Sequence, residues 1–141
     1  TLQLGASTSI KMLSAKGDNS RWQSNNASVI VQIIYGDIEF MLTGDAPASI
    51  EDFLVSQYGT SLGSEVLKLG HHGSNTSTSE LFLNTVAPEY AVVSAGIDNR
   101  YGHPNIDVMA RVFERNINTV STATEGTITF ISDGREVWLE E

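Results

Sequence analysis

The 141-residue chain contains no cysteine. This absence excludes disulfide bonds, zinc–thiolate sites and a cysteine nucleophile. Long hydrophobic runs are absent too, and none approaches the roughly 20 residues that a membrane-spanning helix needs. Residues 1–6 lack the charged-then-apolar pattern of a signal peptide. With 40% hydrophobic residues, we expect one soluble domain over residues 1–141, with its own core and no targeting signal in this chain.

Basic residues are scarce. Eight Lys and Arg stand against 17 Asp and Glu, which gives a formal net charge of -9. An extended basic groove, which neutralises the phosphates of a nucleic acid, is therefore not expected. An enzyme that handles phosphates through bound divalent cations is compatible with this balance, because the cations carry the local positive charge.

Histidine is scarce as well, and two of the three copies are adjacent. His71 and His72 lie between two glycines, directly after the apolar run 66–69. His103 follows the apolar run 90–95. Imidazole is the commonest protein metal ligand and the usual proton carrier near neutral pH. These loops are therefore the first candidates for a functional site.

The hydrophobic pattern predicts an α/β (α+β) fold, in which a mixed sheet carries covering helices and ends in a hairpin. A first hairpin spans 28–43, and a polar loop at 16–26, anchored by Trp22, precedes it. Asp133 and Gly134 predict a type I′ turn in the terminal hairpin. The expected strands are 2–4, 9–13, 28–34, 38–43, 66–69, 90–95, one near 119, 126–131 and 135–139.

Three helices are expected between these strands. The first begins at Ser49, with Asp52 giving a capping box, and ends at Gly59. The second runs to Val86 after serine and threonine caps at 77–79. The third covers about 105–115, and its expected inward residues are Ile106, Met109, Val112 and Phe113.

Asp45 follows the run 38–43 through Gly44. If the strands before Asp45, His71 and His103 are parallel neighbours, these side chains leave the sheet at one edge, where such sheets bind ligands. A carboxylate can bridge two divalent ions. Taken alone, Asp45 is better explained as a turn or helix-capping residue.

The other polar residues of these loops have two readings each. On an extended chain His71 and His72 point in opposite directions, so at most one is expected to bind a metal directly. His103 can shuttle a proton or add a metal contact beside Arg100; alternatively, an Asp98–Arg100 pair pins the loop. Asn25 and Asn26 either face the same cleft or, as is favoured for each taken alone, are turn residues. Side chains with a structural explanation are Lys68 (snorkelling) and Ser74, Ser77 and Ser79 (helix capping).

Together, six segments resemble the C-terminal metallo-β-lactamase-like domain of ComEC-type competence proteins, which are membrane proteins of DNA uptake. The similarity runs over nearly the whole chain, in the family's order and spacing. The segments are Asn25 to Val29, Leu42 to Asp45, Leu67 to Ser74, Ser94 to Gly96, Asn99 to Pro104 and Glu125 to Thr129.

The resemblance implies an αββα metallo-hydrolase fold and a nuclease-type role on incoming DNA. Asp45 matches the family's metal-bridging aspartate, and His71 matches the first histidine of a His-His-Gly-Ser motif that relatives use as a metal ligand. His72 and His103 match neighbouring catalytic positions, where they assist proton transfer or orient phosphate. The implied cofactor is zinc or manganese.

The chain departs from the family pattern in three places. The superfamily's principal metal motif, His-x-His-x-Asp-His, is absent, so the chain resembles the second half of a domain. Asn105 replaces a histidine that often follows the Tyr-Gly-His-Pro segment. No histidine lies near 24–26, where many relatives carry one. We therefore expect weak or absent metal binding in the isolated chain, which would itself be inactive.

Three functions follow as hypotheses. The first is a divalent-metal phosphodiesterase, active in an intact bacterial membrane protein with DNA as substrate and with the domain outside the cytoplasm. The second is a non-catalytic half-domain that binds a partner segment or DNA. The third is a metallo-hydrolase of small molecules on the same fold. We also expect an apolar sheet face where the upstream half packs, and self-association when that half is missing.

Overall fold

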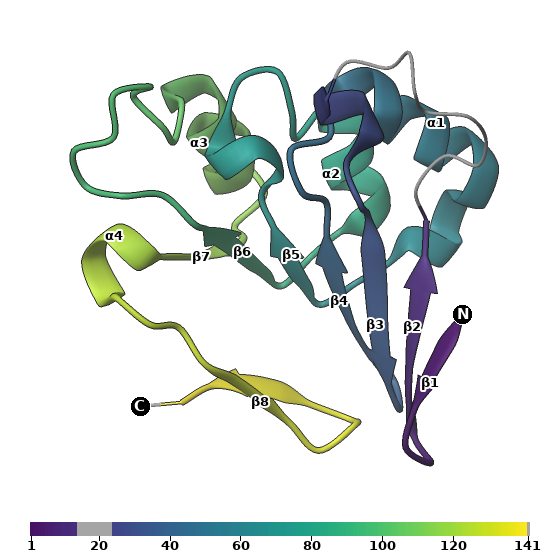
Figure 1. The fold of residues 1–141 in the computed structure, drawn as a ribbon. Coiled ribbons are helices and arrows are strands. Elements are labelled where there is room, and N and C mark those ends of the chain that lie inside the picture. The colour runs from purple at the N-terminus through teal and green to yellow at the C-terminus, as the bar shows by residue number, and fades with distance from the viewer. Residues whose placement is uncertain (14–23, 141) are drawn as a thin grey trace.

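The computed structural model describes residues 1–13 and 24–140. Trp22, and with it most of the loop predicted at 16–26, lies outside the described residues. The described chain forms a mixed α/β fold with a seven-stranded sheet and a separate two-stranded hairpin (Figure 1). This arrangement confirms the predicted mixed sheet, covering helices and terminal hairpin.

The large sheet has the order β1-β2-β3-β4-β5-β6-β7, so neighbours in sequence are neighbours in space. The first four strands are antiparallel, and β4 to β7 run parallel. The strands are β1 (Leu2–Leu4), β2 (Thr8–Met12), β3 (Val31–Tyr35), β4 (Ile38–Leu42), β5 (Val66–Lys68), β6 (Tyr90–Val93) and β7 (Asn118–Ser121). The terminal hairpin pairs β8 (Phe130–Ser132) with β9 (Val137–Leu139).

Three helices connect the parallel strands and gather on one side of the sheet, away from the terminal hairpin (Figure 1). They are α1 (Ala48–Tyr58), α2 (Glu80–Val86) and α3 (Ile106–Phe113). The short α4 (Thr122–Glu125) follows β7 and leads into the terminal hairpin. Three 3-10 turns complete the fold: η1 (Ser24–Ala27), η2 (Gly59–Leu62) and η3 (Gly70–Gly73). None of the helices in 1–13 or 24–140 has the length and hydropathy that crossing a bilayer requires.

The main core lies between the sheet and the first three helices. Met41, Leu67 and Ala91 from successive strands are buried there against Leu54 of α1 and Leu83 of α2. Burying such side chains contributes about 1.5–3 kcal/mol each, so this layer stabilises the whole platform. The alternate residues of the same strands face the terminal hairpin, where a smaller cluster forms from Ile38, Val66, Val137, Phe40, Tyr90, Val92 and Phe130.

The predicted helix faces and turns need three corrections. In α3, Val112 is buried and Met109 packs against the core, as predicted. Ile106 and Phe113, however, are 80% and 62% exposed, and Val108 is buried instead. The capping box at Ser49 does not form, because α1 begins one residue earlier with Pro47 at the N-cap position. The C-cap at Gly59 and the Ser79 N-cap of α2 are as predicted.

The third correction concerns the type I′ turn at Asp133 and Gly134. Ser132 pairs with Val137, so the connection contains four residues rather than two. The Asp133 carboxylate accepts hydrogen bonds from the backbone N–H groups of Arg135 and Glu136, both at 2.9 Å. This side-chain-to-backbone arrangement replaces the tighter turn.

Candidate functional site

The candidate site lies at the carboxyl ends of β4, β5 and β6. These strands are parallel neighbours, so the loops that follow them meet at one rim of the sheet. The rim brings together Asp45 after β4, His71 and His72 after β5, and His103 in the loop after β6. The predicted convergence of these three loops is therefore observed.

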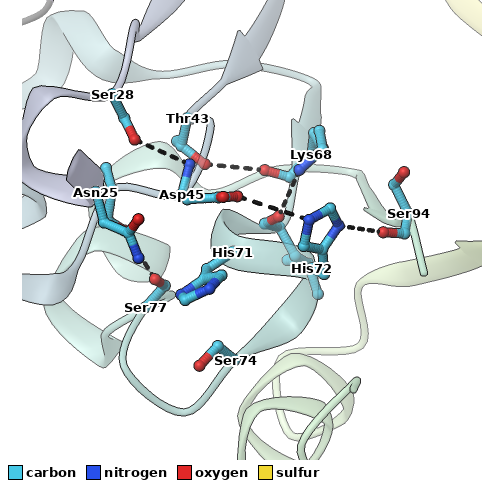
Figure 2. A network of polar contacts seen from close by, with 12 residues as sticks. Asn25, Ser28, Thr43, Asp45, Lys68, His71, His72, Ser74, Ser77 and Ser94 are labelled. Carbon is cyan, nitrogen blue, oxygen red and sulfur yellow. Dashed lines mark hydrogen bonds and ion pairs between the residues drawn. The ribbon is translucent and has the colours of Figure 1, made fainter. Parts of the chain in front are cut away.

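Backbone hydrogen bonds join the first two loops. The N–H of His71 donates to the carbonyl of Gly44 at 2.9 Å, and the N–H of Asp45 donates to Oγ of Ser28 at 3.1 Å (Figure 2). The Thr43 hydroxyl donates to the carbonyl of Lys68 at 3.3 Å. Each loop thus fixes the position of the other.

The histidine loop is not extended. His71 and His72 both have left-handed backbone angles, with φ of 48° and 58°, inside the turn η3. The expectation that an extended chain separates the two rings is therefore wrong, and their centroids lie 6.3 Å apart. Non-glycine residues in this region are strained and are held by their surroundings, a feature that often accompanies function.

His72 is the histidine that pairs with Asp45. Its Nε2 lies 3.8 Å from Oδ1 of Asp45, and its Nδ1 lies 2.6 Å from the carbonyl oxygen of Ser94 (Figure 2). Since a carbonyl accepts only, Nδ1 carries the proton and donates. In the neutral ring the lone pair of Nε2 then faces Asp45, the orientation that a metal ligand or a proton acceptor needs.

His71 lies beside this pair, with its ring centroid 6.3 Å from that of His72. Its Nδ1 lies 3.3 Å from the Thr76 hydroxyl, and its ring centroid lies 5.7 Å from that of His103. The sequence-based assignment gave His71 the metal and His72 the proton transfer. In the structure, the contact with Asp45 belongs to His72, at 3.8 Å.

His103 is held by Asn99. The Asn99 side chain accepts from the backbone N–H of His103 at 2.9 Å and donates to the carbonyls of His103 and Gly96 at 2.6 and 2.8 Å. Burial lowers the pKa of His103, with His71 and His72 acting in the same direction and Asp45 opposing them. The lowered pKa favours the neutral form of the ring.

The predicted Asp98–Arg100 pair does not form within the described chain. The Arg100 guanidinium instead lies over the Tyr101 ring, 4.8 Å from its centroid, and donates to the Tyr101 hydroxyl. Asn25, which we assigned to a turn, lies in η1 at the same rim and points toward Ser77 (Figure 2).

Lys68 is a site residue that the sequence reading missed. Its stem packs beside buried neighbours, and its ammonium reaches the rim, where it donates to the carbonyl of Leu69 at 3.2 Å (Figure 2). Burial lowers the pKa of Lys68, and the charge of Asp45 opposes that shift. Its place at the carboxyl end of β5, next to the His-His loop, was the available signal.

The serines after the histidine loop have structural partners. Ser77 donates to the carbonyl of Ala46 at 2.7 Å, and the Ser79 hydroxyl accepts from the N–H of Phe82 at 3.3 Å. The Ser74 hydroxyl lies 3.1 Å from that of Thr76. Capping is confirmed for Ser79 alone, whereas Ser74 and Ser77 bind within the loop and to the Ala46 carbonyl, and none of these contacts supports a serine nucleophile.

Glu51 stabilises the segment that follows the histidine loop, and the sequence analysis did not identify it. It is fully buried, and its two carboxylate oxygens accept from the N–H groups of Thr78 and Ser79 at 2.6 and 2.8 Å. Burial raises the pKa of Glu51, and these hydrogen bonds partly offset the shift. An acidic residue inside an amphipathic helix gives no sequence sign of this role.

Two cavities of about 510 Å³ each open beside the rim. The first is bounded by His72, Tyr101 and His103, and the second by Lys68 and the apolar sheet face under the terminal hairpin. Ser94 and Thr122 line both, so the two are neighbours. Both lie within the 300–1,000 Å³ that small-ligand sites occupy.

The donor set fits a divalent cation only in part. Asp45 Oδ1 and His72 Nε2 face each other beyond hydrogen-bond distance, as two ligands of one cation do. A zinc site has three or four protein ligands, however, and residues 1–13 and 24–140 contain no group of three or more acidic or histidine side chains placed to hold a metal. The described chain supplies at most part of a metal site.

No family model matches the chain. It is 44% identical over 106 residues to the competence protein ComA of Neisseria gonorrhoeae, an alignment that covers 75% of this chain and 15% of that protein. It is 35% identical over 106 residues to ComE operon protein 3 of Bacillus subtilis, covering 75% of this chain and 14% of that protein. It is also 35% identical over 115 residues to Recombination protein 2 of Haemophilus influenzae, covering 80% of this chain and 14% of that protein.

The chain thus spans about one-seventh of the length of the curated relatives it matches. Identity of 35–44% over most of this chain makes it homologous to a segment of these proteins.

Proposed function

We propose, from this homology to a segment of competence proteins, that the chain is the C-terminal half of a metallo-β-lactamase-like domain in a bacterial membrane protein of DNA uptake. In the intact protein, its rim takes part in hydrolysing a phosphodiester of incoming DNA outside the cytoplasm. The observation that carries the proposal is the approach of Asp45 Oδ1 to His72 Nε2, 3.8 Å apart, where three parallel strands end.

Asp45 and His72 would hold a zinc or manganese ion, with the remaining ligands coming from outside the described residues. When bound, such an ion neutralises phosphate charge and activates water for attack on phosphorus. The homologous motif assigns the same role to His71, which lies in the same loop. The contact with Asp45 favours His72, and a test that separates the two histidines is given in the Discussion.

The chain's own residues orient and neutralise the substrate. The Ser94 carbonyl fixes the tautomer of His72 through Nδ1. The Lys68 ammonium, beside Asp45 at the rim, binds a non-bridging phosphate oxygen as a point charge. His103, held neutral by burial, accepts or relays a proton within the same cluster.

The apolar sheet face supports the half-domain proposal. Paired residues on one face form a row across the sheet, namely Leu2, Ile10, Ile33, Phe40, Val66 and Tyr90. The terminal hairpin packs on Phe40, Val66 and Tyr90 at one end of this row, whereas Leu2 at the other end is 59% exposed. An upstream half of the same domain would cover the remaining surface, and without it the isolated chain self-associates through this face.

A second candidate is a non-catalytic half-domain that binds DNA or a partner segment. The observation that favours it is the incomplete donor set of the described residues. The two candidates differ in one respect, which is whether the intact protein turns over a substrate at the Asp45 rim.

The test uses the full-length protein that contains this chain, with zinc or manganese present. Wild type and Asp45→Asn are assayed on a DNA oligonucleotide, a bis-phosphodiester and a chromogenic lactam. We expect cleavage of the two phosphodiesters, and we expect Asp45→Asn to reduce it at least about 100-fold, as loss of a metal-binding carboxylate does. Hydrolysis of the lactam alone would contradict the proposal, and so would phosphodiester cleavage that survives in Asp45→Asn. DNA binding without cleavage would favour the second candidate.

A further inference from the structure

We propose that the cavity between His72 and Tyr101 is a subsite for one unpaired nucleobase of the strand that is cut. The inference rests on the proposed phosphodiester hydrolysis and adds the part of the substrate that this chain recognises. It is carried by the cavity's lining, by the aromatic side chains at its mouth and by the acidic charge of the chain.

The cavity has the size for a single nucleotide. It measures about 510 Å³, and its lining includes His72 at the reaction rim and Tyr101. A nucleotide whose phosphate lies at Asp45 and His72 would therefore place its sugar and base in the cavity. A base in a duplex is stacked and paired, so it would have to leave the helix to enter.

The mouth of the cavity presents aromatic and cationic surfaces. Tyr101 is 66% exposed, and its ring lies nearly parallel to that of His103, at an interplanar angle of 16° and a centroid distance of 5.8 Å. The Arg100 guanidinium lies against the same tyrosine. Tyrosine, histidine and arginine planes are the surfaces on which unpaired bases stack.

The loop that carries these side chains is preorganised. The three hydrogen bonds of Asn99 tie together Gly96 and His103, which lie on either side of Tyr101. The N–H of Asn105 donates to the carbonyl of Gly73 at 2.8 Å, so the loop is also tied to the histidine turn. A base bound at Tyr101 would therefore not have to order the loop first, which lowers the entropic penalty of binding.

The acidic charge of the chain makes base stacking more important for affinity than contacts with phosphates. With a net charge of -9, the chain cannot gain much affinity by neutralising a run of phosphates. Stacking of a base on an aromatic side chain is worth about 1–3 kcal/mol and does not depend on the base's identity. The subsite would therefore select an unpaired nucleotide without selecting a sequence.

The experiment uses the full-length protein and two fluorescent single strands, oligo-dT and the same strand built entirely from abasic tetrahydrofuran residues. Binding is measured by anisotropy, and cleavage is measured on gels. Tyr101→Ala should weaken binding of oligo-dT about 5- to 150-fold and leave binding of the abasic strand within about twofold. Tyr101→Phe keeps the ring and should behave as wild type. Phe113→Ala removes a comparably exposed aromatic side chain from α3 and serves as the matched control.

Each result bears on the subsite and on the proposed hydrolysis separately. Equal weakening of both strands by Tyr101→Ala would overturn the subsite, because the loss would then be independent of the base. Equal binding of both strands by wild type would overturn it too, while cleavage of either strand would leave the hydrolytic proposal standing. Base-dependent binding without any cleavage would support the subsite and contradict hydrolysis. Failure to bind either strand would contradict both.

Discussion

The carboxylate of Asp45 faces the ring of His72 across 3.8 Å, although the two residues come from the ends of different strands. The His72 ring is held from its far side by the Ser94 carbonyl, and its loop is tied to the Asp45 loop by the hydrogen bond from His71 N–H to Gly44. Three loops thus meet at one polar centre. Substitutions of the residues that hold these loops should therefore change the stability or the activity of this centre.

Lys68 supplies positive charge to this centre. Lys68→Met keeps the apolar stem and removes the ammonium, so we expect phosphodiester cleavage by the full-length protein to fall about 10- to 100-fold, as for the loss of one charged hydrogen bond. Lys68→Arg should recover part of the rate. Lys11→Met, which removes a lysine from β2, is the control and should change the rate less than twofold. Unchanged cleavage in Lys68→Met would exclude a role in phosphate binding.

Glu51 supports the loop that follows the histidines. Glu51→Gln leaves one of the two N–H groups, of Thr78 or Ser79, facing an amide NH₂ instead of an oxygen. We expect the free energy of unfolding of this chain in urea to fall by about 1–3 kcal/mol at pH 7. Asp52→Asn, which changes the neighbouring but exposed residue, should have little effect.

The same substitution tests the raised pKa of Glu51. A carboxyl whose pKa is higher in the folded than in the unfolded state takes up a proton on folding, so its contribution to stability increases as pH falls through the folded-state pKa toward 4.5. The stability difference between wild type and Glu51→Gln should therefore grow on acidification. A difference that shrinks over this range would show that the pKa is not raised.

Gly73 lets the histidine turn approach the loop of His103. Its φ is +82°, and an added Cβ would lie 2.8 Å from Cβ of Pro104. Gly73→Ala should therefore destabilise the chain by about 1–3 kcal/mol. The matched substitution Gly96→Ala meets no atom within 4 Å and should be close to neutral in the same urea titration. Equal effects at the two glycines would contradict the close approach.

Phe130 anchors the terminal hairpin to the sheet. Its ring makes edge contacts with Phe40 and Tyr90, at centroid distances of 6.2 and 5.3 Å. Phe130→Ala should lower the unfolding free energy by about 2–3 kcal/mol and increase the fluorescence of a dye that binds apolar surface. Ile131→Ala, on the more exposed side of the same strand, should cost less than about 1 kcal/mol. Similar losses at both positions would mean that the hairpin does not cover the sheet.

The order of strands and helices could be predicted because the hydrophobic pattern of each segment is local. The inward face of α3 was predicted only in part, because its apolar residues are more than one face can bury. Val112 and Met109 face the core as predicted, but Val108 is buried in place of Ile106 and Phe113. The turn at Asp133 was misjudged for a similar reason, because its carboxylate offered the backbone a competing hydrogen-bond partner.

The meeting of these loops at one rim was predicted from the sequence, whereas the roles of their residues stay predictions. That Asp45, His71 and His103 meet followed from the strand ends alone. The preference of Asp45 for His72 depends on two left-handed residues, whose conformation is stabilised by contacts with another loop. The contacts of Ser94 and Glu51 likewise come from tertiary packing, which no local pattern of residues encodes.

The most direct test of this account is a titration of the full-length protein with zinc and with manganese, in wild type, Asp45→Asn, His72→Gln and His71→Gln. If Asp45 and His72 hold one cation, each of their substitutions should weaken metal binding about 10- to 100-fold. A variant that combines Asp45→Asn with His72→Gln should lose less than the two losses combined. His71→Gln should have the smallest effect of the three. Metal binding that is unchanged in His72→Gln and abolished in His71→Gln would contradict the pairing of Asp45 with His72.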